Sequence, residues 1–175
     1  MGSLSRAAGG YDVATMTIRG AGTVVIEGVT PQEVFDFVLD PDQYRKADTK
    51  IIDVTKLANT ADGMLAREDG LFLGRFRGSI ITRYRWDAPH TIDVTLVHGV
   101  PESVHAWFAI SETNNGTRLE HVEEMHMGHG LLGVVYDSIA RRWFAAAVEQ
   151  EVAEIARLMR SGERGRGISA HANEP

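Results

Sequence analysis

The sequence predicts an α+β fold in which an antiparallel sheet packs against one long C-terminal helix. Residues 50–127 consist of short runs rich in Ile, Val, Thr and aromatic residues, separated by turn-forming Gly, Pro, Asn and Asp. Residues 133–160 contain no proline and no internal glycine, and their apolar residues recur at helical spacing. A chain of 175 residues is the size of one domain.

The composition excludes several classes of protein. Hydrophobic residues make up 43% of the chain and no run approaches the roughly 18 apolar residues of a membrane span, so we expect a soluble protein. The N-terminus lacks the apolar segment of a signal peptide, which favours a cytoplasmic location. Without cysteine, disulfides and thiolate metal sites are excluded. A net charge of −6 argues against nucleic acid as a partner.

The ends of the chain differ in composition from its centre. Residues 1–12 and 162–175 are rich in Gly, Ser and Ala, and we expect both to be flexible tails. Residues 13–161 are then a single domain. Its oligomeric state, monomer or homodimer, does not follow from the sequence.

The first elements are predicted from local signals. Residues 14–28 are typical of a strand, and Thr30 before Pro31 predicts the start of a short helix over residues 31–40. Pro41 ends that helix, and Asp40 caps a second short helix. Turn signals at residues 61–63, 69–70, 88–89, 99–101 and 114–116 then divide residues 50–127 into about six strands, or about seven with the first.

Two central strands alternate between different faces. The even positions of residues 75–86 are predicted to face inward: Phe76, Gly78, Ile80, Thr82, Tyr84 and Trp86. The odd positions include four arginines, which we expect to face solvent and to pair with acids such as Asp93: Arg75, Arg77, Arg83 and Arg85. In the next strand the inward set is His90, Ile92, Val94, Leu96 and His98. Polar and amphipathic residues on inward faces favour a ligand pocket, although a tight core with polar ends at its rim is the alternative.

The hairpin over residues 104–127 is the most informative segment. Asn115 and Gly116 predict a type I′ turn, which places Ile110 opposite His121 and Phe108 opposite Glu123. One face of this hairpin is apolar and carries Val104, Ala106, Phe108, Ile110, Leu119, Met125 and Met127. His121 and Glu123 point to the same face.

Two ionisable residues on an apolar face need an explanation. Each costs several kcal/mol if it is buried dry and without a partner, so we favour a cavity with polar groups over a filled core. Satisfied polar groups in a core or at a rim are the alternative. The neighbouring Glu120, Glu124 and His126 point to the other face, so we expect no metal and no cofactor here.

The C-terminal helix is predicted to lie across the sheet. At ~1.5 Å per residue, residues 133–160 would span ~42 Å. Phe144, Val148, Val152 and Ile155 share its apolar face, and Glu151 falls on the same arc. We interpret Glu151 as a carboxylate that faces a cavity or reaches its rim.

The order of elements and several residues resemble the START-like superfamily, also called SRPBCC, which includes the polyketide cyclase/dehydrase group and the birch-pollen allergen fold. The resemblance rests on Pro31, Glu33, Val34, Phe35, Val38, Asp40, Pro41 and Tyr44, and on Gly116 and Thr117 in the penultimate hairpin. It implies a helix-grip fold, in which a curved sheet wraps the long helix and leaves a cavity for an apolar molecule. No catalytic residue carries over from it.

Three functions therefore compete. The leading hypothesis is binding of a small hydrophobic or aromatic ligand, such as a lipid, sterol or polyketide, at thirteen candidate residues: Phe76, Ile80, Tyr84, Trp86, Leu96, His98, Phe108, Ile110, His121, Glu123, Met125, Phe144 and Val148. The second is a cyclase/aromatase-like enzyme in which His121 and Glu123 transfer protons. The third is a protein-interaction module, for which the outward Trp107 is the best clue.

Overall fold

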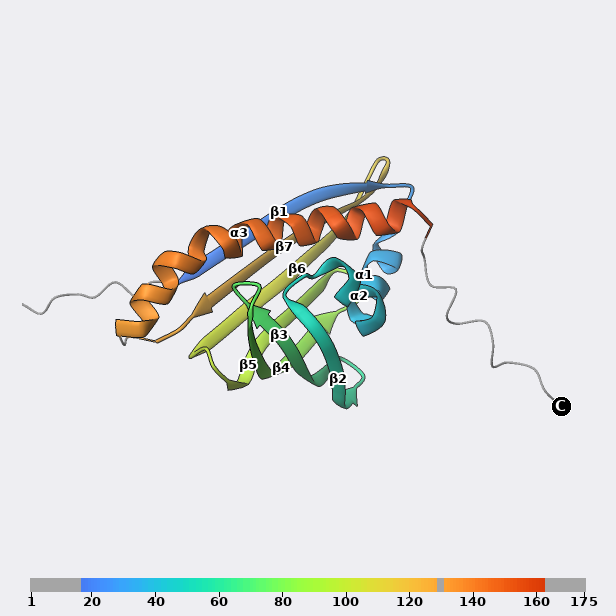
Figure 1. Ribbon diagram of the computed structural model, residues 1–175. Coiled ribbons are helices and arrows are strands. Elements are labelled where there is room, and N and C mark those ends of the chain that lie inside the picture. The colour runs from blue at the N-terminus through green and yellow to red at the C-terminus, as the bar shows by residue number, and fades with distance from the viewer. Residues whose placement is uncertain (1–16, 129–130, 163–175) are drawn as a thin grey trace, which may run out of the picture.

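A computed structural model describes residues 17–128 and 131–162, and of residues 131–138 only the backbone. One antiparallel sheet of seven strands, in the order β1-β7-β6-β5-β4-β3-β2, curves around a long C-terminal helix (Figure 1). The predicted α+β, helix-grip architecture is confirmed. Of the predicted tails at residues 1–12 and 162–175, all residues except Gly162 lie outside the described residues.

The chain begins as its local signals predict. Strand β1 (Ile18–Glu27) leads to α1 (Pro31–Leu39), where Thr30 and Glu33 form a reciprocal capping box. The Thr30 backbone N–H donates to Glu33 at 2.8 Å, and the Glu33 N–H donates to the Thr30 hydroxyl at 3.3 Å. Helix α2 (Pro41–Ala47) follows, with the Asp40 carboxylate accepting from its first turn.

Six strands follow as a meander in which each strand pairs with the next. They are β2 (Ile51–Thr60), β3 (Gly63–Phe72), β4 (Phe76–Asp87), β5 (Thr91–Gly99), β6 (Ser103–Thr113) and β7 (Gly116–His126). Strand β1 then pairs with β7 at one edge of the sheet. The number of strands agrees with the prediction.

Helix α3 (Leu131–Arg160) runs along β1 and above β7 (Figure 1). The helix begins at Leu131, two residues before Gly133, where the sequence predicted its start. Two glycines of β1 allow the close approach, since a Cβ on Gly20 would lie 2.6 Å from Val148 and one on Gly22 would lie 2.8 Å from Val152. The sheet strand nearest the helix therefore carries no side chain at the two points of closest contact.

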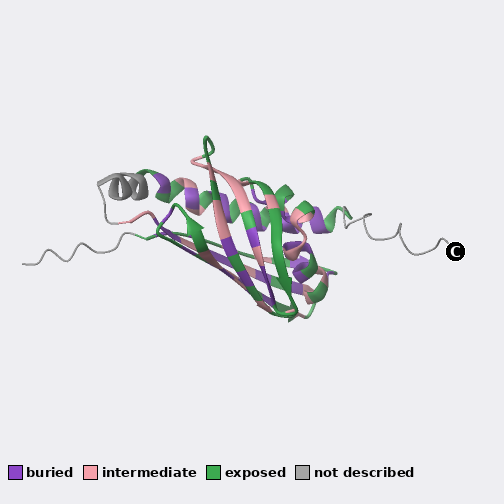
Figure 2. Cartoon of the chain, turned by 90° about the horizontal axis from the view of Figure 1, so that it is seen from below, coloured by how far each residue is buried: buried purple, intermediate pink, exposed green. Residues whose placement is uncertain are grey.

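The core lies between the sheet and the helices, where Figure 2 shows buried residues along the facing sides of the elements. Phe144, Val148, Val152 and Ile155 of α3 are buried, as predicted. The larger cluster joins α1, α2, the end of α3 and the central strands, and a smaller one surrounds Phe144. None of the helices in the described part of the chain has the length and hydropathy of a membrane span.

The predicted turn at residues 69–70 is wrong. Asp69 and Gly70 lie inside β3, and the chain reverses at Leu73 and Gly74, both of which have positive φ. A Cβ on Gly70 would lie 2.7 Å from the carbonyl oxygen of Lys50. This glycine therefore serves a close backbone approach and not a turn.

The predicted register of the β6–β7 hairpin is also wrong, by two residues. Phe108 lies opposite His121 and Ile110 opposite Leu119, with Asn114 and Asn115 in the turn. Neither asparagine has the positive φ of a type I′ turn. A Cβ on Gly116 would lie 2.2 Å from the Ile26 carbonyl oxygen, so β1 explains this glycine. Because the shift is even, His121 stays on the buried face, as predicted.

His98 does not face inward as predicted. A bulge in β5 places Leu96 opposite Thr82 but His98 opposite Ile81, so the alternation of faces changes by one residue and His98 is exposed. The arginines of β4 are exposed as expected. The carboxylate of Asp93, however, lies 2.7 Å from the ring of His105 and not beside an arginine.

We predict that Phe144→Ala lowers the free energy of unfolding by ~3–5 kcal/mol, because its fully buried ring is lost and leaves a cavity. Urea unfolding followed by circular dichroism measures this loss. A change below about 1 kcal/mol would contradict the packing described here.

We also predict that Gly20→Val destabilises the protein by about 1–3 kcal/mol or more, since the new side chain overlaps Val148. The matched control is Ala21→Val, on the exposed face of the same strand, which we expect to change stability by no more than about 0.5 kcal/mol. Equal effects of the two substitutions in the same unfolding assay would show that α3 does not approach β1 this closely.

Candidate functional site

Two small cavities lie on the inner side of the sheet, and an open outer hollow lies at the β3–β4 turn, where residues from both faces of the sheet line it. The outer hollow is open, has a volume of about 730 Å³, and includes Phe72, Leu73, Phe76, Val100 and Met127 in its lining. The first inner cavity, of about 70 Å³, reaches Trp143 and Phe144 of α3. The second, of about 50 Å³, reaches Tyr44, Phe108 and His121. Ile80 lines all three.

A side-chain ring separates the outer hollow from the first inner cavity. Phe72 and Gly78 line both spaces, and a Cβ on Gly78 would lie 2.5 Å from the Phe72 ring. The ring therefore rests on the glycine where the two spaces adjoin. Ile80 also lines both spaces.

The polar end of the first inner cavity is built around Lys50. Its ammonium lies 2.6 Å from Glu151 Oε2, 3.0 Å from Asp48 Oδ1 and 3.2 Å from Glu123 Oε2. The Tyr44 hydroxyl donates to the other oxygen of Glu151 at 2.5 Å. Four segments meet here: α2, the residues just before β2, strand β7 and helix α3.

Local structure fixes the position of the lysine. Asp48 is the residue that ends α2, and its carboxylate accepts a hydrogen bond from the Lys50 backbone N–H at 2.8 Å. This tight turn aims Lys50 into the interior before β2 begins. Although burial lowers the pKa of Lys50, the carboxylates of Asp48, Glu123 and Glu151 together raise it well above its ordinary value, so the side chain is an ammonium.

Glu123 is a carboxyl group whose pKa is shifted to near neutral pH. Burial raises its pKa, Lys50 lowers it, and the charges of Asp48 and Glu151 raise it, with a resulting value of about 7. Glu123 lines both inner cavities. Such a group exchanges protons near neutral pH.

A second carboxylate, Glu68 of β3, lines the same two cavities. It accepts hydrogen bonds from the hydroxyls of Thr82 and Tyr84, the latter at 2.7 Å, and both bonds reach the same oxygen, Oε1. Burial raises the pKa of Glu68, against the effect of these two donors. The Tyr84 hydroxyl also has a raised pKa, because of burial and the charge of Glu68.

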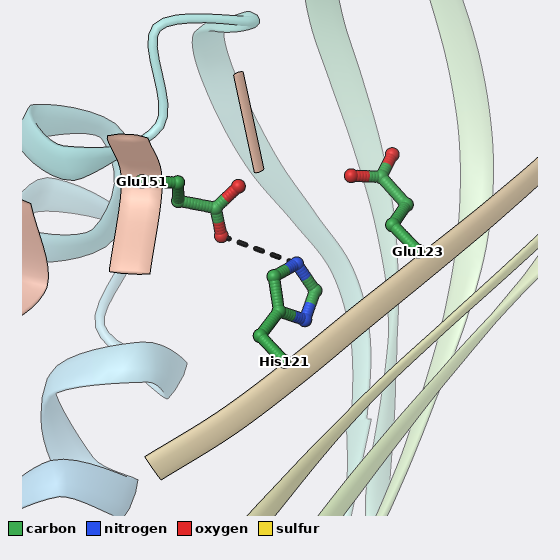
Figure 3. A group of neighbouring side chains, drawn as sticks. All are labelled: His121, Glu123 and Glu151. Atoms are coloured by element: carbon green, nitrogen blue, oxygen red, sulfur yellow. Dashed lines mark ion pairs between the residues drawn. The ribbon is translucent and has the colours of Figure 1, made fainter. Parts of the chain in front are cut away.

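His121 is held in one tautomer. Its Nδ1 lies 3.1 Å from the Trp107 carbonyl oxygen, which can only accept, so Nδ1 carries the hydrogen. Burial, followed by the charge of Lys50, lowers the pKa of His121 to about 3, so the ring is neutral. Its plane stacks on Phe108 at a centroid distance of 3.9 Å. Nε2 makes no hydrogen bond, although Glu151 Oε1 lies 3.3 Å away (Figure 3).

Glu151 gives the neighbourhood a third possible metal ligand that sequence reasoning did not place there. His121, Glu123 and Glu151 offer donor atoms that all lie within 4.8 Å of one another (Figure 3). The Lys50 ammonium, however, already lies within 3.2 Å of both carboxylates. In this conformation the cation that these acids bind is the lysine.

The thirteen candidate residues fall into three groups. Seven line an inner cavity: Ile80, Tyr84, Phe108, His121, Glu123, Met125 and Phe144. Phe76 and His98 are exposed and line the outer hollow. The structure places the other four beside none of these three hollows: Trp86, Leu96, Ile110 and Val148. Trp86, for example, packs edge-on against Phe35 and donates to the Ala61 carbonyl.

Sequence reasoning missed Asp48, Lys50 and Glu68. Asp48 and Lys50 lie in a polar stretch typical of a loop, and nothing local shows that it enters the interior. Glu68 was hidden by the mistaken turn at residues 69–70. Continued alternation from the buried Met64 and Ala66 would have placed it on the inward face. Glu151 was noticed as an exception on the apolar face of the helix, and Lys50 is the reason that it is tolerated.

The titration of Glu123 predicts a pH-dependent difference between wild type and Glu123→Gln. The folded pKa of about 7 lies above the ordinary glutamate value of 4.5, so the folded state binds more protons between these values and Glu123 costs stability as the pH rises. Glutamine does not titrate. We expect the stability of the variant relative to wild type to increase over this window by on the order of a few kcal/mol.

Urea unfolding of both proteins at closely spaced pH values measures this difference. Because the pKa of His121 is lowered to about 3, His121 makes both proteins more stable as the pH rises from about 3 to 6.5. This effect is the same in wild type and Glu123→Gln, so it cancels in the difference between their stabilities. A difference in stability that does not vary with pH would show that Glu123 titrates normally.

The chain matches the family model described as polyketide cyclase / dehydrase and lipid transport over residues 17–160. A comparison with curated proteins finds no match.

Solved structures share the fold at low identity. The Zhui aromatase/cyclase from Streptomyces sp. R1128 is 15% identical with a TM-score of 0.68, covering 86% of this chain and 98% of its own. A START superfamily protein from Mycobacterium smegmatis is 16% identical with a TM-score of 0.62, covering 81% and 98%. Ara h 8.0201 is 11% identical with a TM-score of 0.53, covering 81% and 99%. Since the family model spans most of the chain, the protein belongs to the polyketide cyclase/dehydrase and lipid transport family.

Proposed function

We propose that the protein binds a small hydrophobic or aromatic ligand between the sheet and α3. The observation that carries this proposal is the outer hollow of about 730 Å³, which adjoins a smaller cavity with a polar end. Its volume is in the range of pockets for small molecules. The apolar body of the ligand lies in the outer hollow at the β3–β4 turn, and its polar end enters the first inner cavity, between the sheet and α3, towards Glu123.

The lining supports an apolar body. Phe72, Leu73, Phe76, Val100 and Met127 line the outer hollow together with polar residues such as Arg67 and Arg77, and Phe76 and Val100 are 59% and 68% exposed. Apolar side chains this exposed lose water when a ligand covers them, at about 25 cal/mol for each Å² of surface. Their burial under a ligand is therefore a source of affinity that does not depend on the identity of the polar end.

Acid/base catalysis is the second candidate, and the pKa of Glu123 favours it. A carboxyl group that titrates near 7 at the end of a pocket suits proton removal from a carbon next to a carbonyl. His121 suits only the role of a neutral acceptor, because its Nδ1 hydrogen is held by Trp107. An enzyme of the cyclase/aromatase kind would use Glu123 as the base and His121 as an acceptor of hydrogen bonds.

The interaction-module hypothesis gains no support from Trp107. Its ring lies 5.0 Å from that of His105, and its carbonyl holds His121. These contacts account for its presence on the outer side of the sheet.

We predict that Ile80→Trp weakens binding of an apolar fluorescent dye by at least about tenfold, or ~1.4 kcal/mol, because Ile80 lines all three hollows. Ile52→Trp is the matched control, since Ile52 is exposed and borders none of them. Fluorescence titration of the folded proteins measures both affinities. Equal binding by wild type and Ile80→Trp would overturn the proposed site.

The same assay separates binding from catalysis. For a carrier, Glu123→Gln and His121→Ala each change dye affinity by less than about tenfold. For an enzyme, each lowers turnover of a ligand recovered from the native protein by ~10²–10⁴-fold. Loss of turnover with dye binding preserved would decide for catalysis.

A further inference from the structure

The ammonium and hydroxyl donors of the polar network at the inner cavities are all in use. The ammonium of Lys50 has three hydrogens and lies within reach of three carboxylates, those of Asp48, Glu123 and Glu151. The hydroxyl of Tyr44 donates to Glu151, and those of Thr82 and Tyr84 donate to Glu68. Each hydroxyl has only one hydrogen, so all of these donors are in use.

Acceptors, by contrast, remain free. Both hydrogen bonds to Glu68 reach Oε1, and the contact of Lys50 with Glu123 reaches Oε2, which leaves the second oxygen of each carboxylate open in the described part of the molecule. His121 Nε2 is an acceptor without a hydrogen bond, and its side chain is 1% exposed. Glu68, Glu123 and His121 all line the second inner cavity.

The charges are equally one-sided. Among the side chains of residues 17–128 and 139–162, those at the two inner cavities and in the network behind them carry four carboxyl groups, Asp48, Glu68, Glu123 and Glu151, and one ammonium, Lys50. His121 is neutral, and the arginines nearest the site, Arg67 and Arg77, line the outer hollow. Burial of excess negative charge is unfavourable unless a proton or a cation compensates it.

We propose that the ligand carries a protonated primary amine at the end that enters the inner cavities. This inference rests on the proposed ligand site and specifies its chemical class. The N–H groups of such a head meet the free oxygens of Glu68 and Glu123, which line both inner cavities. An anionic head meets four carboxyl groups, and a hydroxyl supplies only one donor for these oxygens.

The space agrees with this head group. The first inner cavity holds about 70 Å³, and a water molecule in the liquid occupies ~30 Å³, so an ammonium group with its methylene fits. The apolar remainder extends past Phe72 into the outer hollow. Lys50 contacts Oε2 of Glu123, so the ammonium group of the ligand contacts the other oxygen of the same carboxylate.

The test compares three probes with one apolar body: 2-naphthylmethylamine, 2-naphthylmethanol and 2-naphthoate. Isothermal titration calorimetry near neutral pH measures each affinity for the full chain. We expect the amine to bind at least about tenfold more tightly than the alcohol, with the carboxylate weakest. In Glu68→Gln and in Glu123→Gln, we expect the ratio of amine to alcohol affinity to fall to within about threefold.

Glu124→Gln is the control, because Glu124 lies on the outer face of the same strand and pairs with Arg19. We expect it to keep the wild-type ratio. Equal binding of amine and alcohol to wild type would overturn the amine while leaving the apolar site in place. Tighter binding of the carboxylate than of the amine would overturn the proposed ammonium head, and would indicate that Arg67 and Arg77 bind an anionic head. Binding of none of the three would overturn the proposed ligand site itself.

Discussion

The buried ammonium of Lys50 is the interaction on which the rest of this interior depends. It draws Asp48 from the end of α2, Glu123 from β7 and Glu151 from α3 to within 3.2 Å of one atom. A charge with so little contact with water is tolerated only when it is paired and hydrogen-bonded. The lysine therefore sets the position of helix α3 relative to the sheet at the depth of the cavities, where apolar packing alone would leave that position loosely defined.

Helix α3 meets two different surroundings across the sheet. On β1, Gly20 and Gly22 let the helix come close, and Phe144 and Val148 fill the contact. Next to this contact lie Lys50 and the carboxylates around it. These carboxylates offer more hydrogen-bond acceptors than the neighbouring ammonium and hydroxyls offer donors. The same helix thus closes a tight core along one edge of the sheet and borders a polar cavity above its centre.

Sequence patterns correctly predicted the features that depend only on residues close together in the chain. The caps of Thr30 and Asp40 and the inward position of His121 all follow from a few neighbouring residues. The errors arose where distant segments decide. At Gly116 the backbone of β1 leaves no space for a side chain. At Gly70 the backbone of the residues before β2 leaves none. The partners of Lys50 lie up to 101 residues away, so no local pattern could place them.

The free acceptors are the feature that stability alone does not account for. A network that served only to hold α3 would be most favourable with every buried polar group satisfied, since each unsatisfied group costs about 1–3 kcal/mol. Glu151, which is fully buried, meets that condition with both oxygens in use. The buried Nε2 of His121 does not, and Glu68 and Glu123, which line the cavities, each keep an oxygen without a protein partner. The division follows the cavity wall: groups behind it are paired within the protein, and groups facing it keep a free oxygen. Such a boundary is expected where part of the polar network is completed by a bound molecule.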